Sequence, residues 1–292
     1  MFLWFCIAVR VVANPCSNAL QKLLAARGLH AGTLMAVTHV GLTVLSLPWL
    51  VSAPPASREF WLWVSLSAAL AAAANWLIIE ALQRSDLSVL GPINSYKPVV
   101  SLLPGLLLLG ERLTWPALSG IGLVVIGSGL LVDSGSRRTA GVTALLAERG
   151  VQLRFAALLL SAGEAVTLKR ALRLSGPELT FAAWASLGAL FVLPLALRSL
   201  TRNARDLAPN QRATAARGLA GLIITTGLMQ YCTLVTLVAL PVGIALALFQ
   251  TSTLLTVVLG YTVFREPHFQ KRLVGAGIMS VGAAVLILTR PV

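Results

Sequence analysis

The stretch LSVLGPINSYKPVVSLLPGLLLLGERLTWPALSGIGLVVIGSGLL, residues 87–131, decides the fold. It contains two apolar segments joined by a short charged corner, Gly110-Glu111-Arg112. The pattern recurs at a constant offset of 155 residues, so that Gly105, Glu111, Gly120, Gly122 and Gly127 correspond to Gly260, Glu266, Gly275, Gly277 and Gly282. A match at one fixed offset through a corner and two segments is the signature of an internal repeat. The sequence therefore predicts two related halves.

The composition predicts a membrane protein. Of the 292 residues, 57% are hydrophobic and only 11% are charged, whereas a soluble domain carries about 25% charged residues. The apolar runs are about 20 residues long, as membrane helices require, while barrel strands alternate over about ten. We therefore predict an all-α integral membrane protein, and we expect it in the inner membrane of a bacterium.

Ten transmembrane helices are predicted, five in each half. Because five is odd, the second half must enter the membrane from the opposite side, which makes the halves inverted repeats. The predicted divisions are a first repeat at 1–133, a connection at 134–153 and a second repeat at 154–292. The predicted spans are 2–22, 31–51, 60–82, 87–109, 115–132, 154–172, 179–198, 217–238, 242–264 and 272–289.

The net charge of +13 is interpreted as an orientation signal and as contacts with lipid headgroups, not as a nucleic-acid surface. Connections after the odd-numbered spans carry 15 Lys and Arg residues, and the other connections with the C-terminal tail carry 6. By the positive-inside rule, the odd connections are cytoplasmic and both termini are outside.

Charged residues within membrane spans cost about 2.5–3.5 kcal/mol each at a helix centre and are candidates for function. Lys97 lies about ten residues into the fourth span and shares a helical face with Asn94 and Ser101. Pro98 removes a backbone donor, which leaves the Asn94 carbonyl without its usual partner. Lys97 could face a substrate, or it could form an internal ion pair with Glu80 or Glu164.

A polar stripe follows the first span at helical spacing: Arg10, Asn14, Ser17 and Gln21. Such a face suits a helix that lines a water-filled pathway. In the alternative interpretation, Arg10 extends to the nearer membrane surface.

Two acidic residues are candidates for charge balance or proton coupling. Glu80 lies near the end of the third span, where Arg84 could pair with it one turn later. Glu164 lies deeper, and it could accept a proton or act as the counter-ion of Lys97 or Arg10.

The second half contributes neutral polar residues, chiefly Gln230 and Gln250. The repeat-related aromatics Trp76 and Tyr231 could stack on a substrate, although packing is the simpler role. At the two corners, Glu111 and Glu266 are predicted to cap or pair at helix ends. The glycines of the fifth and tenth spans allow close helix contact and could support a homodimer.

The sequence contains no catalytic motif and no cluster typical of a metal or cofactor site. The three cysteines, Cys6, Cys16 and Cys232, have neither the count nor the spacing of a disulfide framework or a zinc site. We therefore expect no enzyme activity, no cofactor and no bound metal.

The corners and their flanking spans resemble the EamA family of the drug/metabolite transporter superfamily. The resemblance is carried by Ala81-Leu82, Pro92, Pro98, the run 109–113, the glycines from Gly120 to Gly129, Phe249-Gln250, the run 264–266 and the glycines from Gly275 to Gly282. It implies ten helices in an inverted repeat, a central cavity and alternating access. It also implies cytoplasmic termini, opposite to the charge count, and Lys97 departs from the neutral residue usual in the family.

The combined prediction is a secondary transporter of a small polar metabolite with an anionic or zwitterionic structure. Arg10 and Lys97 would attract the acidic group, and Glu80 or Glu164 would balance charge or receive an amino group. Hydrogen bonds would come from Asn14, Asn94, Gln230 and Gln250. The alternatives are a flippase for a polyprenyl-phosphate-linked sugar, whose phosphate the two cations would hold, and a membrane scaffold without transport activity.

Overall fold

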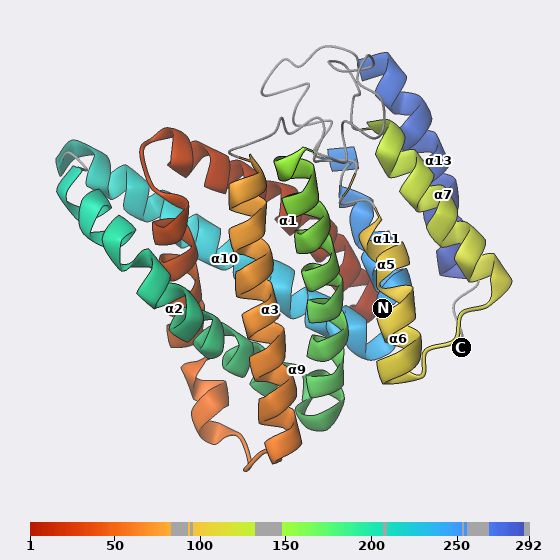
Figure 1. Cartoon of the computed structure of the whole chain (residues 1–292), viewed down its shortest axis with the longest axis horizontal. Helices are drawn as coiled ribbons and strands as arrows, with labels where there is room; N and C mark the ends of the chain where they lie inside the picture. Colours follow the sequence, from red (N-terminus) through yellow and green to blue (C-terminus); the bar gives the residue numbers. More distant parts are fainter. Residues whose placement is uncertain are drawn as a thin grey trace. The chain divides into compact units, whose positions relative to one another are not determined.

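The computed structural model describes residues 1–82, 93, 96–131, 148–206, 209–252, 254–255 and 269–288. Nearly all of them are helical, and no strand occurs among them (Figure 1). The helices are α1 (Phe2–Ala26), α2 (Ala31–Ser52), α3 (Arg58–Leu82), α5 (Lys97–Val100), α6 (Leu102–Leu109), α7 (Trp115–Leu131), α9 (Arg149–Asp206), α10 (Pro209–Ala239), α11 (Val242–Gln250) and α13 (Phe269–Leu288).

Five described helical stretches are long and apolar enough to cross a membrane: Phe2–Ala26, Ala31–Ser52, Arg58–Ile78, Arg149–Pro194 and Arg212–Ala239. Shorter apolar helices occupy Lys97–Leu109, Trp115–Ser128 and Gly277–Leu288. A bilayer core about 30 Å thick needs about 20 apolar residues in a helix. The helical, apolar character of the predicted membrane protein is therefore present in the structure.

Two helices differ in detail from their predicted spans. The sixth and seventh spans, expected as separate helices with a connection at 173–178, run together as α9 with one break at Gly176. Gly176 has φ 78° and ψ 175°, a conformation essentially restricted to glycine, and Pro177 then starts the next helical turn without needing a backbone donor. The described part of the fourth span consists of α5 and α6, which meet at Ser101. Ser101 has helical φ and ψ, and its N–H donates to the Lys97 carbonyl while its own carbonyl accepts the Gly105 N–H.

The chain forms two compact units, and each combines segments from both predicted halves. Unit 1 contains Met1–Ala72 and Thr167–Val238, and unit 2 contains Ala73–Val166 and Ala239–Val292. The packing units and the sequence repeats are thus different divisions of the chain. The repeat boundaries at 1–133 and 154–292 stay a prediction.

In unit 1, helices α1, α2 and α10 and the connection between α1 and α2 share a core of Leu24, Leu29, Leu34, Ala215 and Leu222. Small residues bring the helices together. A methyl group at Gly218 would lie 2.8 Å from Leu24, and one at Gly227 would lie 2.9 Å from Leu42. The backbone of α10 therefore lies close against the side chains of both α1 and α2.

In unit 2, α7 and α13 lie side by side and touch through glycines (Figure 1). A methyl group at Gly127 would lie 2.6 Å from the Gly275 carbonyl oxygen, and one at Gly282 would lie 2.8 Å from the Gly120 carbonyl oxygen. The contacts are reciprocal, because Gly275 and Gly282 are the repeat counterparts of Gly120 and Gly127. The glycines of α7 and α13 thus contact each other within the unit. The homodimer stays a prediction.

Helix α11 forms the centre of unit 2. Its residues from Val242 to Phe249 are all buried, and it packs against α5, α6 and α7. Gly243 makes this close packing possible, since a methyl group there would lie 2.5 Å from Leu102. The hydrophobic segment 242–250 is therefore a core helix of its unit.

Candidate functional site

Two residues of the polar stripe predicted on the first span, Arg10 and Ser17, contact α10 in unit 1, whereas Gln21 is exposed. Arg10 Nε donates a hydrogen bond to Thr233 Oγ1 at 2.8 Å, and Ser17 Oγ lies 2.9 Å from Thr226 Oγ1. The partner residue moves from Thr233 back to Thr226 as the chain advances from Arg10 to Ser17, seven residues in each helix. The two helices are therefore antiparallel. We call these four residues, with Asn14 and Gln230, the polar seam.

The helical period explains why these residues share the seam. Thr226, Gln230 and Thr233 are spaced at four and three residues, which places them on one face of α10. Gln230 is only 8% exposed, and the antiparallel register puts it at the level of Asn14. The structure therefore places Arg10, Asn14 and Gln230 on one helix pair, and their role in substrate binding stays a prediction.

Arg10 is held in a defined orientation. The Thr233 hydroxyl accepts the Arg10 hydrogen bond and itself donates to the Met229 carbonyl at 2.8 Å. This chain of hydrogen bonds fixes the hydroxyl rotor, so the guanidinium is anchored through Nε. Neither Thr226 nor Thr233 was singled out from the sequence, although their spacing with Gln230 was a signal that could have found them.

Tyr231 points away from the seam, because residues two apart on a helix differ by about 200°. Its ring stacks on Trp49 at a centroid distance of 5.5 Å, and its hydroxyl donates to Glu178 Oε1 at 2.9 Å. Phe181 stands edge-on to both rings. We call Trp49, Glu178, Phe181 and Tyr231 the aromatic corner. Three of its members were not predicted, since nothing local links α2, α9 and α10.

The remaining predicted residues with described positions lie in unit 2. Lys97 is half-buried at the first position of α5, and Gln250 is the last residue of α11. These two short helices pack on one another. Ser252, the repeat counterpart of Lys97, is buried just beyond α11.

Three further candidates in unit 2 lie on longer helices. Glu80 and Trp76 are near the end of α3, and Glu164 is in α9. The Trp76 side chain is 50% exposed, whereas its counterpart Tyr231 is packed in the aromatic corner. Asn94 and Glu266 lie outside the described residues. The single cavity expected to unite all these candidates stays a prediction.

The first corner forms a helix cap. Gly110 ends α6 with φ 68° and donates its N–H to the Leu106 carbonyl at 3.1 Å, the left-handed ending typical of glycine. The turn directs Glu111 toward α11, where its Oε2 accepts the Val242 N–H at 2.8 Å. Val242 is the first residue of α11, so the carboxylate satisfies an N–H that a helix start leaves open and complements the helix dipole.

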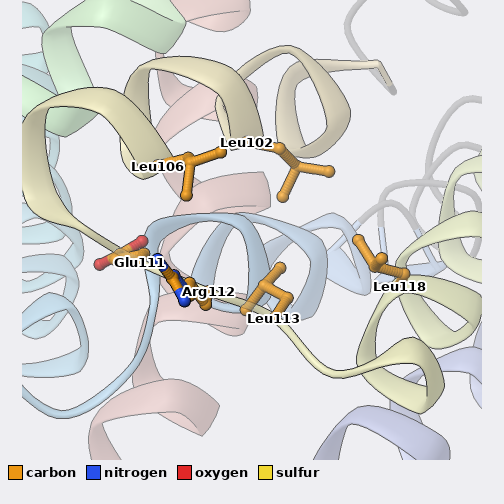
Figure 2. Close-up of a pocket in the computed structure, with 6 residues that line it drawn as sticks. All are labelled: Leu102, Leu106, Glu111, Arg112, Leu113 and Leu118. Atoms are coloured by element: carbon orange, nitrogen blue, oxygen red, sulfur yellow. The ribbon is translucent and has the colours of Figure 1, made fainter.

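A cavity of about 550 Å³ opens beside this corner. It is lined by Leu102, Leu106, Glu111, Arg112, Leu113 and Leu118. Figure 2 shows the leucines of α6 facing the corner, with Glu111 and Arg112 at one end and Leu118 at the other. The cavity is therefore mainly apolar, with its charged groups confined to one end.

The comparisons with known proteins agree with this architecture. The sequence profile described as the EamA-like transporter family matches residues 17–132 and again 148–288. Among 29 matching chains of solved structures, one crystal structure of a protein superposes with a TM-score of 0.70 at 16% identity over 97% of both chains. That likeness shows the fold alone. The comparison with curated proteins gave no match. With most of its length matched by the profile, in two successive copies, the chain belongs to the EamA-like transporter family, whose members are membrane transporters of the drug/metabolite type.

Proposed function

We propose that this chain is a secondary transporter of a small polar metabolite that carries an acidic group, either an anion or a zwitterion. The observation that carries the proposal is the polar seam, a row of hydrogen-bonding side chains along two membrane helices with Arg10 anchored to Thr233. A cation within a span is costly and marks a substrate pathway. A planar guanidinium matches carboxylate and phosphate geometry better than an ammonium does.

Alternating access between two inverted repeats is the proposed mechanism. The reciprocal glycine contacts between α7 and α13 support a twofold relation, because each contact is matched by its repeat-related counterpart. Lys97 at the start of α5 would add a second cationic group, and Glu80 or Glu164 would balance the charge.

Neutralising Arg10 tests the proposal. In proteoliposomes, Arg10→Met should lower kcat/KM for an accepted acidic substrate about tenfold or more, the effect of losing one charge-assisted hydrogen bond. Arg10→Lys should recover part of the activity. The measurement is uptake of radiolabelled amino acids and carboxylates, first screened by the thermal stabilisation of the purified protein.

The matched control is Arg58→Met, which removes an exposed arginine at the start of α3 and should leave uptake unchanged. Lys97→Ala serves as the second test variant. If Arg10→Met and Lys97→Ala both transport every acidic substrate as fast as the parent, the acidic-substrate assignment is wrong.

A flippase for a polyprenyl-phosphate-linked sugar is a second candidate, favoured by the leucine-lined cavity of unit 2. An apolar space of about 550 Å³ with Arg112 at one end suits an isoprenoid segment whose phosphate lies near a guanidinium. Mass spectrometry of the protein purified from native membranes should then detect a phosphate-bearing polyprenyl lipid, and Leu106→Asp should abolish its co-purification. Retention of only bulk phospholipids in both proteins would exclude this candidate.

A further inference from the structure

We propose that the leucine-lined cavity of unit 2 binds one glycerophospholipid with an anionic headgroup. The cavity measures about 550 Å³, within the range of about 300–1,000 Å³ typical of small-molecule sites. Leucines line most of it, and its charged groups lie at one end (Figure 2). A phospholipid has the same order of chemistry, with a charged headgroup followed by an apolar acyl chain.

The charged end of the cavity coincides with the end of an apolar helix. Arg112 follows α6 directly, whereas Leu106 and Leu102 lie about 6 Å and about 12 Å back along that helix from Gly110. Trp115, the first residue of α7, is 84% exposed, which suits an indole at the level of the lipid headgroups. The cavity therefore extends from the membrane interface along the helix, in the direction that an acyl chain takes.

The cavity has a packed inner wall and an open rim. Leu102 and Leu113 pack against α11, where a methyl group at Gly243 would lie 2.5 Å from the first and 3.6 Å from the second. Because α11 is buried from Val242 to Phe249, these two side chains have a fixed support. Leu106 is 46% exposed, so the opposite side of the cavity is accessible to lipid.

Arg112 provides a cation for the headgroup. Its side chain is exposed and makes no hydrogen bond or ion pair within the described part of the chain, whereas the Glu111 carboxylate accepts the Val242 N–H at 2.8 Å. A guanidinium forms paired, charge-assisted hydrogen bonds with phosphate oxygens. A zwitterionic headgroup would bring a second cation close to Arg112, so the site favours a lipid with a net negative charge.

The inference concerns a resident lipid and does not depend on the metabolite proposed as substrate. The cavity belongs to unit 2 and the polar seam to unit 1, so failure here would leave the assignment of Arg10 untouched. The flippase candidate uses the same cavity for a different lipid. The test below therefore compares a glycerophospholipid with a polyprenyl phosphate.

Native mass spectrometry of the delipidated full chain tests the site, with phosphatidylglycerol and phosphatidylcholine of identical acyl chains as probes. The first bound phosphatidylglycerol should have a Kd about fivefold lower than the first bound phosphatidylcholine, the effect of one basic side chain on an anionic lipid. Arg112→Gln should remove this preference. Leu106→Trp fills the cavity and should weaken the binding of both lipids about tenfold or more.

The matched controls are Arg58→Gln, at an exposed position of α3, and Leu107→Trp, at a 71% exposed position of α6 outside the cavity lining. Both should bind the two lipids like the parent, and thermal unfolding in lipid-free detergent identifies any variant that has lost its fold. The proposal is overturned if the parent binds both phospholipids equally, if Arg112→Gln keeps the preference, or if folded Leu106→Trp binds like the parent. Preferential displacement of phosphatidylglycerol by a polyprenyl phosphate would also overturn it and would favour the flippase.

Discussion

Gly127→Ala is expected to destabilise the protein by roughly 2–3 kcal/mol, the upper part of the range for overpacked sites. The added methyl group would lie 2.5 Å from the Met279 backbone nitrogen and 2.6 Å from the Gly275 carbonyl oxygen. These are backbone atoms of α13, which cannot rotate away as a side chain can. The helices must therefore separate, and unit 2 loses the close packing that joins α7 to α13.

Helix propensity acts in the opposite direction, since alanine is favoured over glycine by about 1 kcal/mol in a helix interior. The steric cost is larger because the two helices touch through their backbones. The midpoint of thermal unfolding in detergent should fall on the order of 5 °C. Gly282→Ala should behave similarly, because its methyl group would meet the backbone of α7 at 2.7 Å.

Gly122→Ala is the matched control on the same helix, because a methyl group there would meet no atom of another helix within 4 Å in the described part of the chain. It should leave the midpoint unchanged or raise it slightly through helix propensity. An unfolding midpoint that falls equally for Gly122→Ala and Gly127→Ala would contradict the packing argument and point to a general intolerance of alanine in α7.

Glu111→Ala is expected to cost about 2 kcal/mol, within the range for hydrogen bonds to charged groups. The variant removes the acceptor of the Val242 N–H and the negative charge at the start of α11. Because α11 is buried from its first residue to Phe249, water cannot readily replace the lost acceptor. The corner should loosen where α6, α7 and α11 meet.

Glu111→Gln separates the two contributions, because the amide oxygen can still accept the hydrogen bond without the charge. It should cost about half as much as Glu111→Ala in thermal unfolding. Arg112→Gln is the control, since the neighbouring side chain is exposed. Equal stability of the parent and Glu111→Ala would mean that the capping bond contributes nothing measurable.

Several features of the site could be predicted from the sequence because they depend on local spacing. The polar face of α1 follows from the helical period, and the same rule explains Thr226 and Thr233 on α10. The contact between Glu178 and Tyr231 could not be predicted, because the two residues lie 53 positions apart in the chain. The stacking of Trp49 on Tyr231 could not be predicted either, because the two rings come from different helices.

By itself the sequence determined the apolar helices, the repeated corner and the glycine positions, because hydropathy, offset and turn chemistry are properties of neighbouring residues. Only the tertiary structure decided which partners these features have: Glu111 caps a helix that begins 131 residues later, Gly127 meets Gly275, and Thr233 orients Arg10. These pairings depend on how helices distant in the chain pack, and no local pattern specifies the face or the register at which two apolar helices meet.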